Sequence, residues 1–245
     1  MARPRFHLTP EKLALERVYL DGQEARHVGV RRLKTGQEVS LFDAAGGEAT
    51  GRVERVREGV VELAVIDRPV PLPQPRLRII LGLGLIRWER LRLAVEKATE
   101  LGVSAVWPLL TARTRSFAAA RQPKLKRVVI EALKQCHRSQ GPVIEAAMSL
   151  EEALKRSRPV QDKIILLRFA PPLARMFETS DLPEEVLVLV GPEGGFTAAE
   201  VEAAGEAGFR PGGLTPAILR TETAALAAVS LIQALWGEED RERKT

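Results

Sequence analysis

The sequence predicts an α/β fold in which a mostly parallel sheet carries helices on both faces, preceded by a small β-rich domain. Three observations lead to this prediction. From residue 77 onward, short apolar runs alternate with helical patterns. Before residue 70, strand-like runs follow one another with only turns between them. A proline-rich stretch separates these two patterns.

The first seventy residues indicate a small antiparallel sheet or barrel. The stretch from Glu38 to Arg68 contains three strand-like runs, and turn signals at 43–47 and 57–59 separate them. Ahead of these runs, the sequence DGQEARHVGVRRL has the pattern of a short helix. That helix would present the side chains of Arg26, His27, Arg31 and Arg32.

The stretch from Arg68 to Arg76 has four prolines in nine residues. Proline favours extended backbone and cannot donate to a sheet, so this stretch is the best candidate for a linker. We therefore expect a first domain over 1–70, a linker over 71–76 and a second domain over 77–237. The charged residues 238–245 would form a frayed tail.

Four apolar runs in the second domain are typical of strands covered on both faces. They are RLRIILGLGL, VSAVWPLL, DKIILLRF and EVLVLVG. A helix over Trp88–Leu101 would bury one face and end at Gly102; that face comprises Trp88, Leu91, Val95, Ala98 and Leu101. Ser149 and Glu152 have the spacing of a capping box, which predicts a further short helix.

A second amphipathic helix is predicted over Lys124–His137. Its inward face would comprise Leu125, Val128, Ala132, Leu133 and Cys136, and lysines and arginines would surround the other side. Cys136 is the one cysteine of the chain, which excludes an intrachain disulfide and offers no metal cluster. We expect it to pack in the core.

Basic residues concentrate in the middle of the chain. Residues 71–140 carry 14 Lys and Arg against 4 Asp and Glu, whereas the whole chain has a net charge of +5. Two interpretations of this cluster remain open: a surface for a polyanion such as nucleic acid, or a solvated arginine-rich face. The apolar runs are too short for a membrane span and no signal peptide is recognisable, so we expect a soluble, cytoplasmic protein.

The sequence VLVLVGPEGGFTAAEV joins a buried strand to a helix through a glycine-rich turn. Thr197 and Glu200 have capping-box spacing, so the helix should begin at about Ala198. The glycines then lie at the carboxyl end of a strand, where open α/β sheets bind ligands. The loop lacks the GxGxxG and P-loop patterns, and the Glu193 carboxylate would repel a phosphate. A cationic or uncharged ligand fits better, and the alternative is a tight turn without a ligand.

The sequence LTPAILRTETAALAAVSLIQALW combines polar residues with an apolar helix. Thr221 would be the N-cap, and the negative charge of Glu222 in the first turn would interact favourably with the helix dipole. The helix is apolar almost all round, so more than one neighbour must bury it. The Arg-Thr-Glu-Thr cluster at its start is either a satisfied buried network or an active site.

Together, LVGPEGGFTAAEVEAAGEAGF and LTPAILRTETAALAAVSLIQ resemble the C-terminal signature of the knotted SPOUT-class RNA methyltransferases. The nearest resemblance is to the bacterial enzymes that methylate N3 of a uridine in small-subunit (16S) ribosomal RNA. It extends to LRLAVEKATELGVSAVWPLLTARTRS, to IEALKQCHRSQGPVI and, more weakly, to ARHVGVRRL. One departure is visible: Leu214-Thr215-Pro216 stands where the family has Leu-Gly ahead of Ile-Leu-Arg.

The resemblance implies a PUA-like β-barrel ahead of a catalytic domain with a deep trefoil knot, a rare exception to unknotted topology. S-adenosylmethionine would lie bent in the knot, held by two loops and by the chain after Leu167. The residues implied are Leu167, Leu189, Val190, Gly191, Glu193, Gly194, Gly195, Leu214, Ile218, Leu219, Arg220, Thr221 and Thr223. The family also implies a homodimer in which the partner chain closes the site, with no metal and no membrane.

Methylation at N3 requires loss of the N3 proton and alignment of the nitrogen with the methyl group. Arg220 is the candidate stabiliser of the developing anion, and Glu222 or Glu193 could accept the proton. The residues expected to bind RNA are Arg3, Arg5, Arg26, His27, Arg31, Arg32, Arg113, Arg115, Lys124, Arg127 and Arg138. The alternatives are a ribose 2′-O-methyltransferase of the same knotted class and a non-catalytic RNA-binding assembly factor. The RNA substrate could be naked or part of the assembled small subunit.

Overall fold

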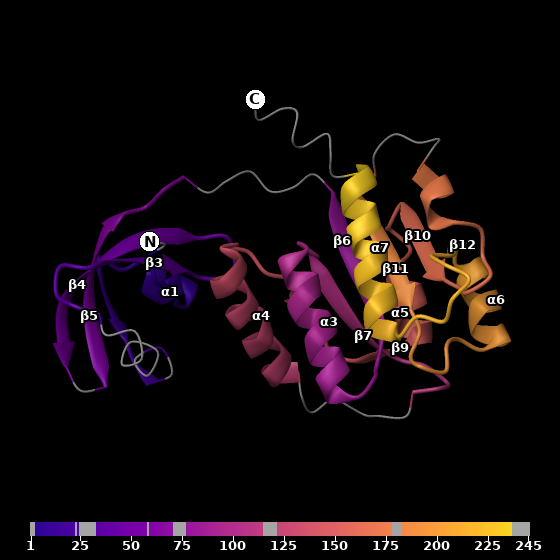
Figure 1. Cartoon of the computed structure of the whole chain (residues 1–245), viewed down its shortest axis with the longest axis horizontal. Helices are drawn as coiled ribbons and strands as arrows, with labels where there is room; N and C mark the ends of the chain where they lie inside the picture. The colour runs from indigo at the N-terminus through magenta and orange to yellow at the C-terminus, as the bar shows by residue number, and fades with distance from the viewer. Residues whose placement is uncertain are drawn as a thin grey trace. The chain divides into compact units, whose positions relative to one another are not determined.

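The computed structural model describes residues 3–22, 24, 33–57, 59–70, 77–114, 122–177 and 183–236 (Figure 1). The chain divides into two compact units. The first comprises Met1–Pro73 with Leu133–Gly141, and the second comprises Gln74–Ala132 with Pro142–Thr245. The expected linker and charged tail lie outside the described residues, as do the predicted RNA contacts at Arg26, His27, Arg31, Arg32 and Arg115.

Within the described residues, five strands of the first unit form one sheet in the order β1-β3-β4-β5-β2. The strands are β1 (Arg5–His7), β2 (Arg17–Leu20), β3 (Glu38–Phe42), β4 (Glu48–Arg57) and β5 (Val60–Asp67). The three strands predicted from the sequence are β3, β4 and β5, and they pair antiparallel as expected. Two short strands extend this sheet, β2 antiparallel to β5 and β1 parallel to β3.

Alternate side chains of this sheet point to one side and form a core. Phe6, Leu20, Leu41 and Leu63 are fully buried there. The short helix α1 (Pro10–Leu13) begins at the N-cap Thr9 and contributes Leu13 to the same core. The predicted antiparallel sheet therefore has the hydrophobic core that it needs to be stable.

Residues 133–141 belong to the first unit, although the sequence analysis assigns them to the second domain. Backbone hydrogen bonds connect this segment to the β3–β4 turn: Gly46 N donates to Ser139 O, and Gly141 N donates to Ala44 O, each at 3.1 Å. No local sequence pattern predicts this pairing, because the partners lie almost a hundred positions apart in the sequence.

In the second unit, the described strands form a seven-stranded sheet in the order β12-β10-β11-β6-β7-β8, with β9 also paired to β7. Every pairing in it is parallel, as predicted. Its strands are β6 (Arg78–Gly84), β7 (Ala105–Leu110), β8 (Val143–Ile144), β9 (Met148–Ser149), β10 (Asp162–Leu166), β11 (Glu185–Val190) and β12 (Arg210–Gly212). The four predicted strands are β6, β7, β10 and β11.

Helices cover both faces of this sheet, as predicted (Figure 1). Ile80, Leu187 and Leu189 pack in one core cluster with residues of α5 (Leu150–Arg156) and α6 (Ala198–Glu206). The intervening strand residues point to the opposite face. There α3 (Trp88–Glu100) and α7 (Thr221–Trp236) pack on each other, and α7 also contacts β6 and β11.

The predicted helix starts are confirmed at α5 and α6. Ser149 accepts a hydrogen bond from Glu152 N, and Thr197 with Glu200 forms a full capping box. At α7 the prediction is one residue off: Thr221 is the first helical residue and not the N-cap, and Ala224 N donates to Arg220 O. The short 3-10 helix η2 (Leu173–Phe177) was not predicted, because prolines precede it and it lacks a helical period.

The helix α4 (Gln122–Cys136) carries a different buried face from the one predicted. Val129 is buried, whereas Val128 is half-buried. Cys136 is half-buried too, so the expectation that it packs in the core was wrong. Its position at the last turn explains this, because the helix ends there and the chain turns through His137 with a positive φ of 60°. No helix in the described part of the chain has the length and apolar character needed to cross a membrane.

Candidate functional site

A cleft of about 380 Å³ opens in the second unit at the carboxyl ends of β10, β11 and β12. Three stretches of the chain form its walls: 166–168, 190–196 and, except for Gly213 and Pro216, 212–219. Thr221 and Ala224, in the first turn of α7, complete the lining. This is the edge at which parallel α/β sheets bind ligands, and the volume lies within the range of ligand pockets.

The glycine-rich loop forms a wall of this cleft, as the sequence predicts. Gly195 N donates to Pro192 O at 2.8 Å, and Gly195 has a φ of +68°, a conformation that favours glycine. A Cβ on Gly191 would lie 3.1 Å from the Gly195 backbone. A Cβ on Gly195 would instead meet nothing within 4 Å. The glycines thus permit a tight turn that leaves open space on its outer side.

Two side chains hold the loop in place. Thr197 N donates to Glu200 Oε2 at 2.7 Å, and the Oε1 atom of the same carboxylate accepts from Ala112 N at 2.8 Å. The Arg113 guanidinium donates to Gly194 O at 2.6 Å. Arg113 is predicted from the sequence to bind RNA; in the structure it is exposed, and its Nη1 atom donates to the glycine loop. Arg113 therefore supports the glycine-rich wall of the cleft.

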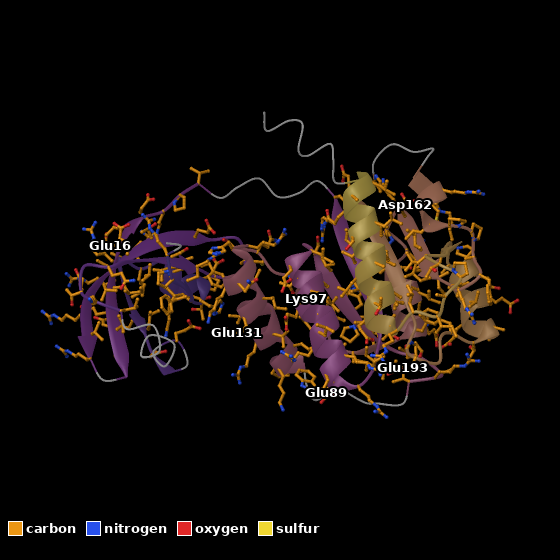
Figure 2. All side chains as sticks on the ribbon, viewed as in Figure 1. Glu16, Glu89, Lys97, Glu131, Asp162 and Glu193 are labelled. Carbon is orange, nitrogen blue, oxygen red and sulfur yellow. The ribbon has the colours of Figure 1, made fainter. Side chains whose placement is uncertain are left out.

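Two carboxylates approach a single arginine at the edge of the cleft. The Nη1 atom of Arg90 lies 3.4 Å from Glu193 Oε1, and its Nε atom lies 3.8 Å from Glu222 Oε1. The Glu193 side chain is 41% exposed, while that of Glu222 is 8% exposed. Glu193 extends from the lower edge of the second unit (Figure 2). The arginine partly compensates both negative charges.

Arg90 was missed by the sequence analysis. It lies on α3, a helix that was considered only for its apolar face. Its location could have been predicted from the order of the elements. Because α3 follows β6, the first turn of α3 lies at the same edge of the sheet as the glycine loop. A basic residue in that turn can reach the carboxylate of Glu193.

Glu222 has one oxygen without a partner. Its Oε2 atom is buried and accepts no hydrogen bond from any described residue. A buried carboxylate oxygen is costly to leave unsatisfied. Glu222 itself is not among the residues that line the cleft, although the adjacent Thr221 is.

The loop that departs from the family pattern is well supported. Pro216 O accepts from Arg168 Nε at 3.1 Å, and Thr215 Oγ1 accepts from Ala217 N at 3.3 Å. Leu214 still lines the cleft. The departure therefore keeps the wall of the cleft in place.

Most residues predicted to contact a cofactor line the cleft. They are Leu167, Val190, Gly191, Glu193, Gly194, Gly195, Leu214, Ile218, Leu219 and Thr221. The structure does not bring the other three to the lining: Leu189 is buried inside the sheet, and Arg220 and Thr223 are exposed to solvent. The unpredicted neighbours are Leu166, Arg168, Pro192, Phe196, Gly212, Thr215, Ala217 and Ala224.

The described residues that were predicted to bind RNA differ in their exposure and partners. Lys124 and Arg127 are exposed on α4, and Arg138 is half-buried. Arg3 forms an ion pair with Glu38 at 2.6 Å, and Arg5 is buried in the first unit. Within the described residues, no group of three or more His, Cys, Asp or Glu side chains could hold a metal ion.

Comparison with known proteins supplies the family. A model of an RNA methyltransferase domain matches residues 73–233, and a model of an RNA methyltransferase PUA domain matches residues 20–65. Ribosomal RNA small subunit methyltransferase E of Mycobacterium tuberculosis is 32% identical over 230 residues, 89% of this chain and 87% of that protein. The chain belongs to the ribosomal RNA small subunit methyltransferase E family. The predictions of an RNA methyltransferase and of a PUA-like first domain are thereby confirmed.

Other relatives in this methyltransferase E family agree over nearly the whole chain. The Bacillus subtilis protein of that name is 29% identical and covers 87% of this chain and 88% of its own length. The crystal structure of the Neisseria gonorrhoeae protein bound to S-adenosylmethionine is 32% identical, with a TM-score of 0.87. That alignment covers 96% of this chain and 98% of the other. The trefoil knot that the resemblance implies stays a prediction.

Proposed function

We propose that this member of the methyltransferase E family transfers a methyl group from S-adenosylmethionine to N3 of a uridine in small-subunit ribosomal RNA. The observation that carries the proposal is the cleft at the strand ends, with the Glu193 carboxylate on its glycine-rich wall. A relative that covers 96% of the chain binds the same cofactor. Cytoplasmic action follows from the substrate, since ribosomal subunits are cytoplasmic.

The lining of the cleft fits S-adenosylmethionine chemically. The cofactor is a sulfonium cation, and Glu193 offers a carboxylate where a phosphate would be repelled. Leu167, Leu214 and Leu219 offer apolar surface suited to an adenine. The backbone of 190–195 and 214–219 would hold the remaining polar groups. When bound, the cofactor supplies an electrophilic methyl group on its positively charged sulfur.

Two residues of this chain have proposed roles in the reaction. The N3 proton of uridine must leave, and the Oε2 atom of Glu222 is a buried acceptor without a partner among the described residues. Loss of that proton spreads negative charge over the ring carbonyls. The Arg220 side chain is exposed and has no hydrogen bond or ion pair to another described residue, so its donors are available to such an anion.

We also propose a homodimer. Ile218, which lines the cleft, is 77% exposed, and Leu235 near the end of α7 is 43% exposed. A second copy of the chain that covered them would remove apolar surface from water and close the cleft. Sedimentation velocity tests this part, with a dimer expected at micromolar protein concentration.

The function is tested by methylating small ribosomal subunits that lack the modification. Assembled subunits and naked 16S ribosomal RNA serve as parallel substrates, and the RNA is then digested to nucleosides for mass spectrometry. We expect 3-methyluridine, formed on at least one of the two substrates. A 2′-O-methylated nucleoside would instead indicate ribose methylation, and the absence of any methylated nucleoside together with tight RNA binding would indicate an assembly factor.

A further inference from the structure

A second hollow, of about 410 Å³, lies entirely within the first unit. It is lined from β1, β3, β4, the end of β5 and the segment that follows α4. None of the residues around it belongs to the cofactor cleft. Its volume is in the range of small-ligand pockets, and the methyltransferase reaction as described above makes no use of it.

The hollow is lined by hydrogen-bonding groups of both kinds. Arg3, Arg5 and His137 provide nitrogen donors, while Glu48 and Asp67 provide carboxylates. Asp67 is exposed and has no hydrogen bond or ion pair to another described residue. Its carboxylate is therefore available to a ligand.

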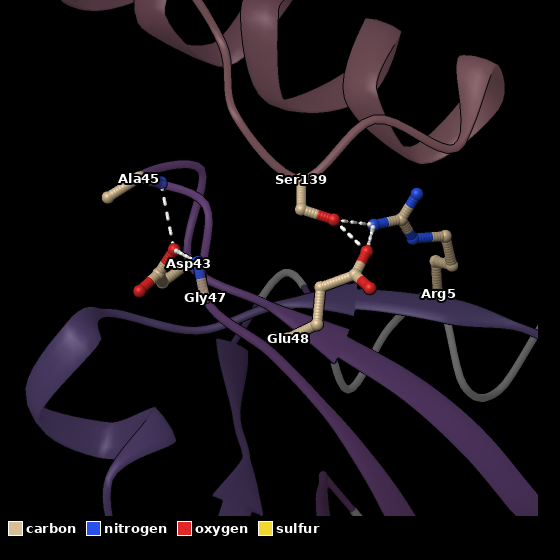
Figure 3. A network of polar contacts seen from close by, with 6 residues as sticks. All are labelled: Arg5, Asp43, Ala45, Gly47, Glu48 and Ser139. Carbon is tan, nitrogen blue, oxygen red and sulfur yellow. Dashed lines mark hydrogen bonds and ion pairs between the residues drawn. The ribbon is translucent and has the colours of Figure 1, made fainter. Parts of the chain in front are cut away.

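Arg5 lines this hollow, and Glu48 and Ser139 hold its guanidinium (Figure 3). Its Nη2 atom lies 3.1 Å from Glu48 Oε1 and 2.9 Å from Ser139 Oγ, and Ser139 also donates to Glu48. The residue is only 6% exposed, yet its Nε atom has no hydrogen-bond partner among the described residues. A buried guanidinium N–H without an acceptor is costly. The Arg5 guanidinium also packs over the Phe42 ring, 4.7 Å from its centroid.

The backbone around the hollow departs from regular geometry at two places. The pairing of β4 with β5 shifts register between Thr50 and Gly51, opposite Asp67. His137 has a φ of +60°, which is uncommon for a residue with a side chain. Bulges and left-handed residues change the direction in which side chains point. Thr50 and Asp67, at the register shift, and His137 all line the same hollow.

The charge of the lining indicates the kind of ligand. Two arginines face two carboxylates, so the site offers no excess of positive charge to a phosphate. A nucleobase, in contrast, carries donors and acceptors side by side and no net charge. Single-stranded RNA is recognised through such splayed bases, hydrogen-bonded along their edges.

We propose that this hollow binds one unpaired guanine of the RNA substrate. The proposal rests on the proposed function, since it assumes that the chain binds ribosomal RNA. Guanine presents two adjacent N–H donors on its Watson–Crick edge, and the free Asp67 carboxylate accepts from both. Its O6 and N7 atoms accept from arginine, which is the commonest specific contact to this base. Adenine lacks the N1–H donor and could offer Asp67 only its N6 amino group, so the two-bond contact would be lost.

The test measures binding of the full-length protein to two short RNAs, UUGUU and UUAUU, by fluorescence anisotropy. We expect the guanine-containing RNA to bind on the order of tenfold more tightly, because one bidentate contact discriminates by about 1–3 kcal/mol. Asp67→Asn should abolish that preference and weaken the binding of UUGUU. The matched control is Glu62→Gln, an acidic side chain on the same strand that does not line the hollow.

The sign of the Asp67 effect separates a base from a phosphate. If the hollow held a phosphate, removal of the negative charge would strengthen RNA binding and would leave no preference for guanine. That result, or an unchanged preference in Asp67→Asn, would overturn the proposal. Methylation of small subunits, measured on the same variants, tests the proposed function separately: active protein with no guanine preference refutes only the guanine site.

Discussion

The Nη1 atom of Arg90 lies 3.4 Å from Oε1 of Glu193, and this ion pair joins the first turn of α3 to the glycine-rich loop. The same arginine lies 3.8 Å from Glu222 through its Nε atom. One cation therefore orients an exposed carboxylate of the cleft and compensates a buried one.

We expect Arg90→Ala to reduce methylation on the order of tenfold, because hydrogen bonds to charged groups contribute about 1.5–3 kcal/mol. Stability should fall as well, because the buried Glu222 carboxylate loses its compensating charge, whereas the partly exposed pair with Glu193 contributes about 1 kcal/mol or less. Single-turnover methylation and thermal unfolding measure the two effects. Arg92→Ala is the control, as Arg92 pairs with Glu96 on the same helix. Full activity in Arg90→Ala would exclude the arginine from the site.

Gly195→Val should abolish binding of S-adenosylmethionine while the fold persists. The positive φ of Gly195 disfavours a β-branched residue by roughly 1–2 kcal/mol. Its side chain would also enter the open space beside the loop, which the cofactor needs. Calorimetric titration with the cofactor tests this. Gly205→Val, at an equally open position on α6 with no positive φ, should bind the cofactor normally. Equal affinity in both variants would show that the cofactor lies elsewhere.

Arg220→Ala should lose on the order of a hundredfold in methylation rate, which is typical for removal of one preorganised donor to a developing anion. Cofactor affinity and the dimer should be retained, because the Arg220 side chain is exposed and outside the lining of the cleft. Single-turnover kinetics, calorimetry and sedimentation are compared for the same preparation. If methylation rate, cofactor affinity and dimerisation were all lost together, Arg220 would have a structural role and no role in the reaction.

Lys124→Ala combined with Arg127→Ala should weaken RNA binding regardless of sequence. Both side chains are exposed on α4. Each lost phosphate contact should flatten the log–log salt dependence of binding by about one unit. Arg113→Ala should behave differently, since its guanidinium holds Gly194 O: cofactor affinity should fall and the salt dependence should stay. An identical salt slope in the double variant would mean that the α4 side chains are merely solvated.

Acidification should destabilise the protein in part through His7. Burial is the main cause that lowers the pKa of His7 below its usual 6.5, and Glu24 opposes this shift. The unfolded chain therefore binds the proton more readily, so stability is lost as the pH falls below about 6.5. His7→Gln should flatten this decline in urea unfolding between pH 7 and pH 5. An NMR titration that placed the pKa of His7 above 6.5 would reverse the expected sign.

Much of the second unit follows from local sequence patterns. Near-continuous apolar runs at β6, β7, β10 and β11 predict strands buried on both faces, and Thr197 with Glu200 predicts the start of α6. The glycine-rich loop could be located for the same reason, because the end of a parallel strand is a predictable place. These features depend on residues close together in the sequence.

The features that the sequence analysis missed depend on contacts between distant residues. Arg90 and Glu193 are about a hundred positions apart, and no period or motif joins them. Arg113 was predicted to bind RNA because of its charge. Its hydrogen bond to Gly194 O, 81 positions away in the sequence, was not predicted. The hollow beneath Asp67 combines β1, β3, β4 and β5 with the segment after α4, and only the folded chain brings these together.

The inclusion of residues 133–141 in the first unit has a consequence for how the protein is made. Ser139 binds Arg5 and Glu48, so the first unit is incomplete until the ribosome has synthesised a segment that follows β6, α3 and β7. A fragment that ends at residue 73 would lack this partner and leave the Arg5 guanidinium with one contact fewer. Neither unit is a continuous piece of the polypeptide, and a gene cut at the proline-rich stretch would encode two incomplete proteins.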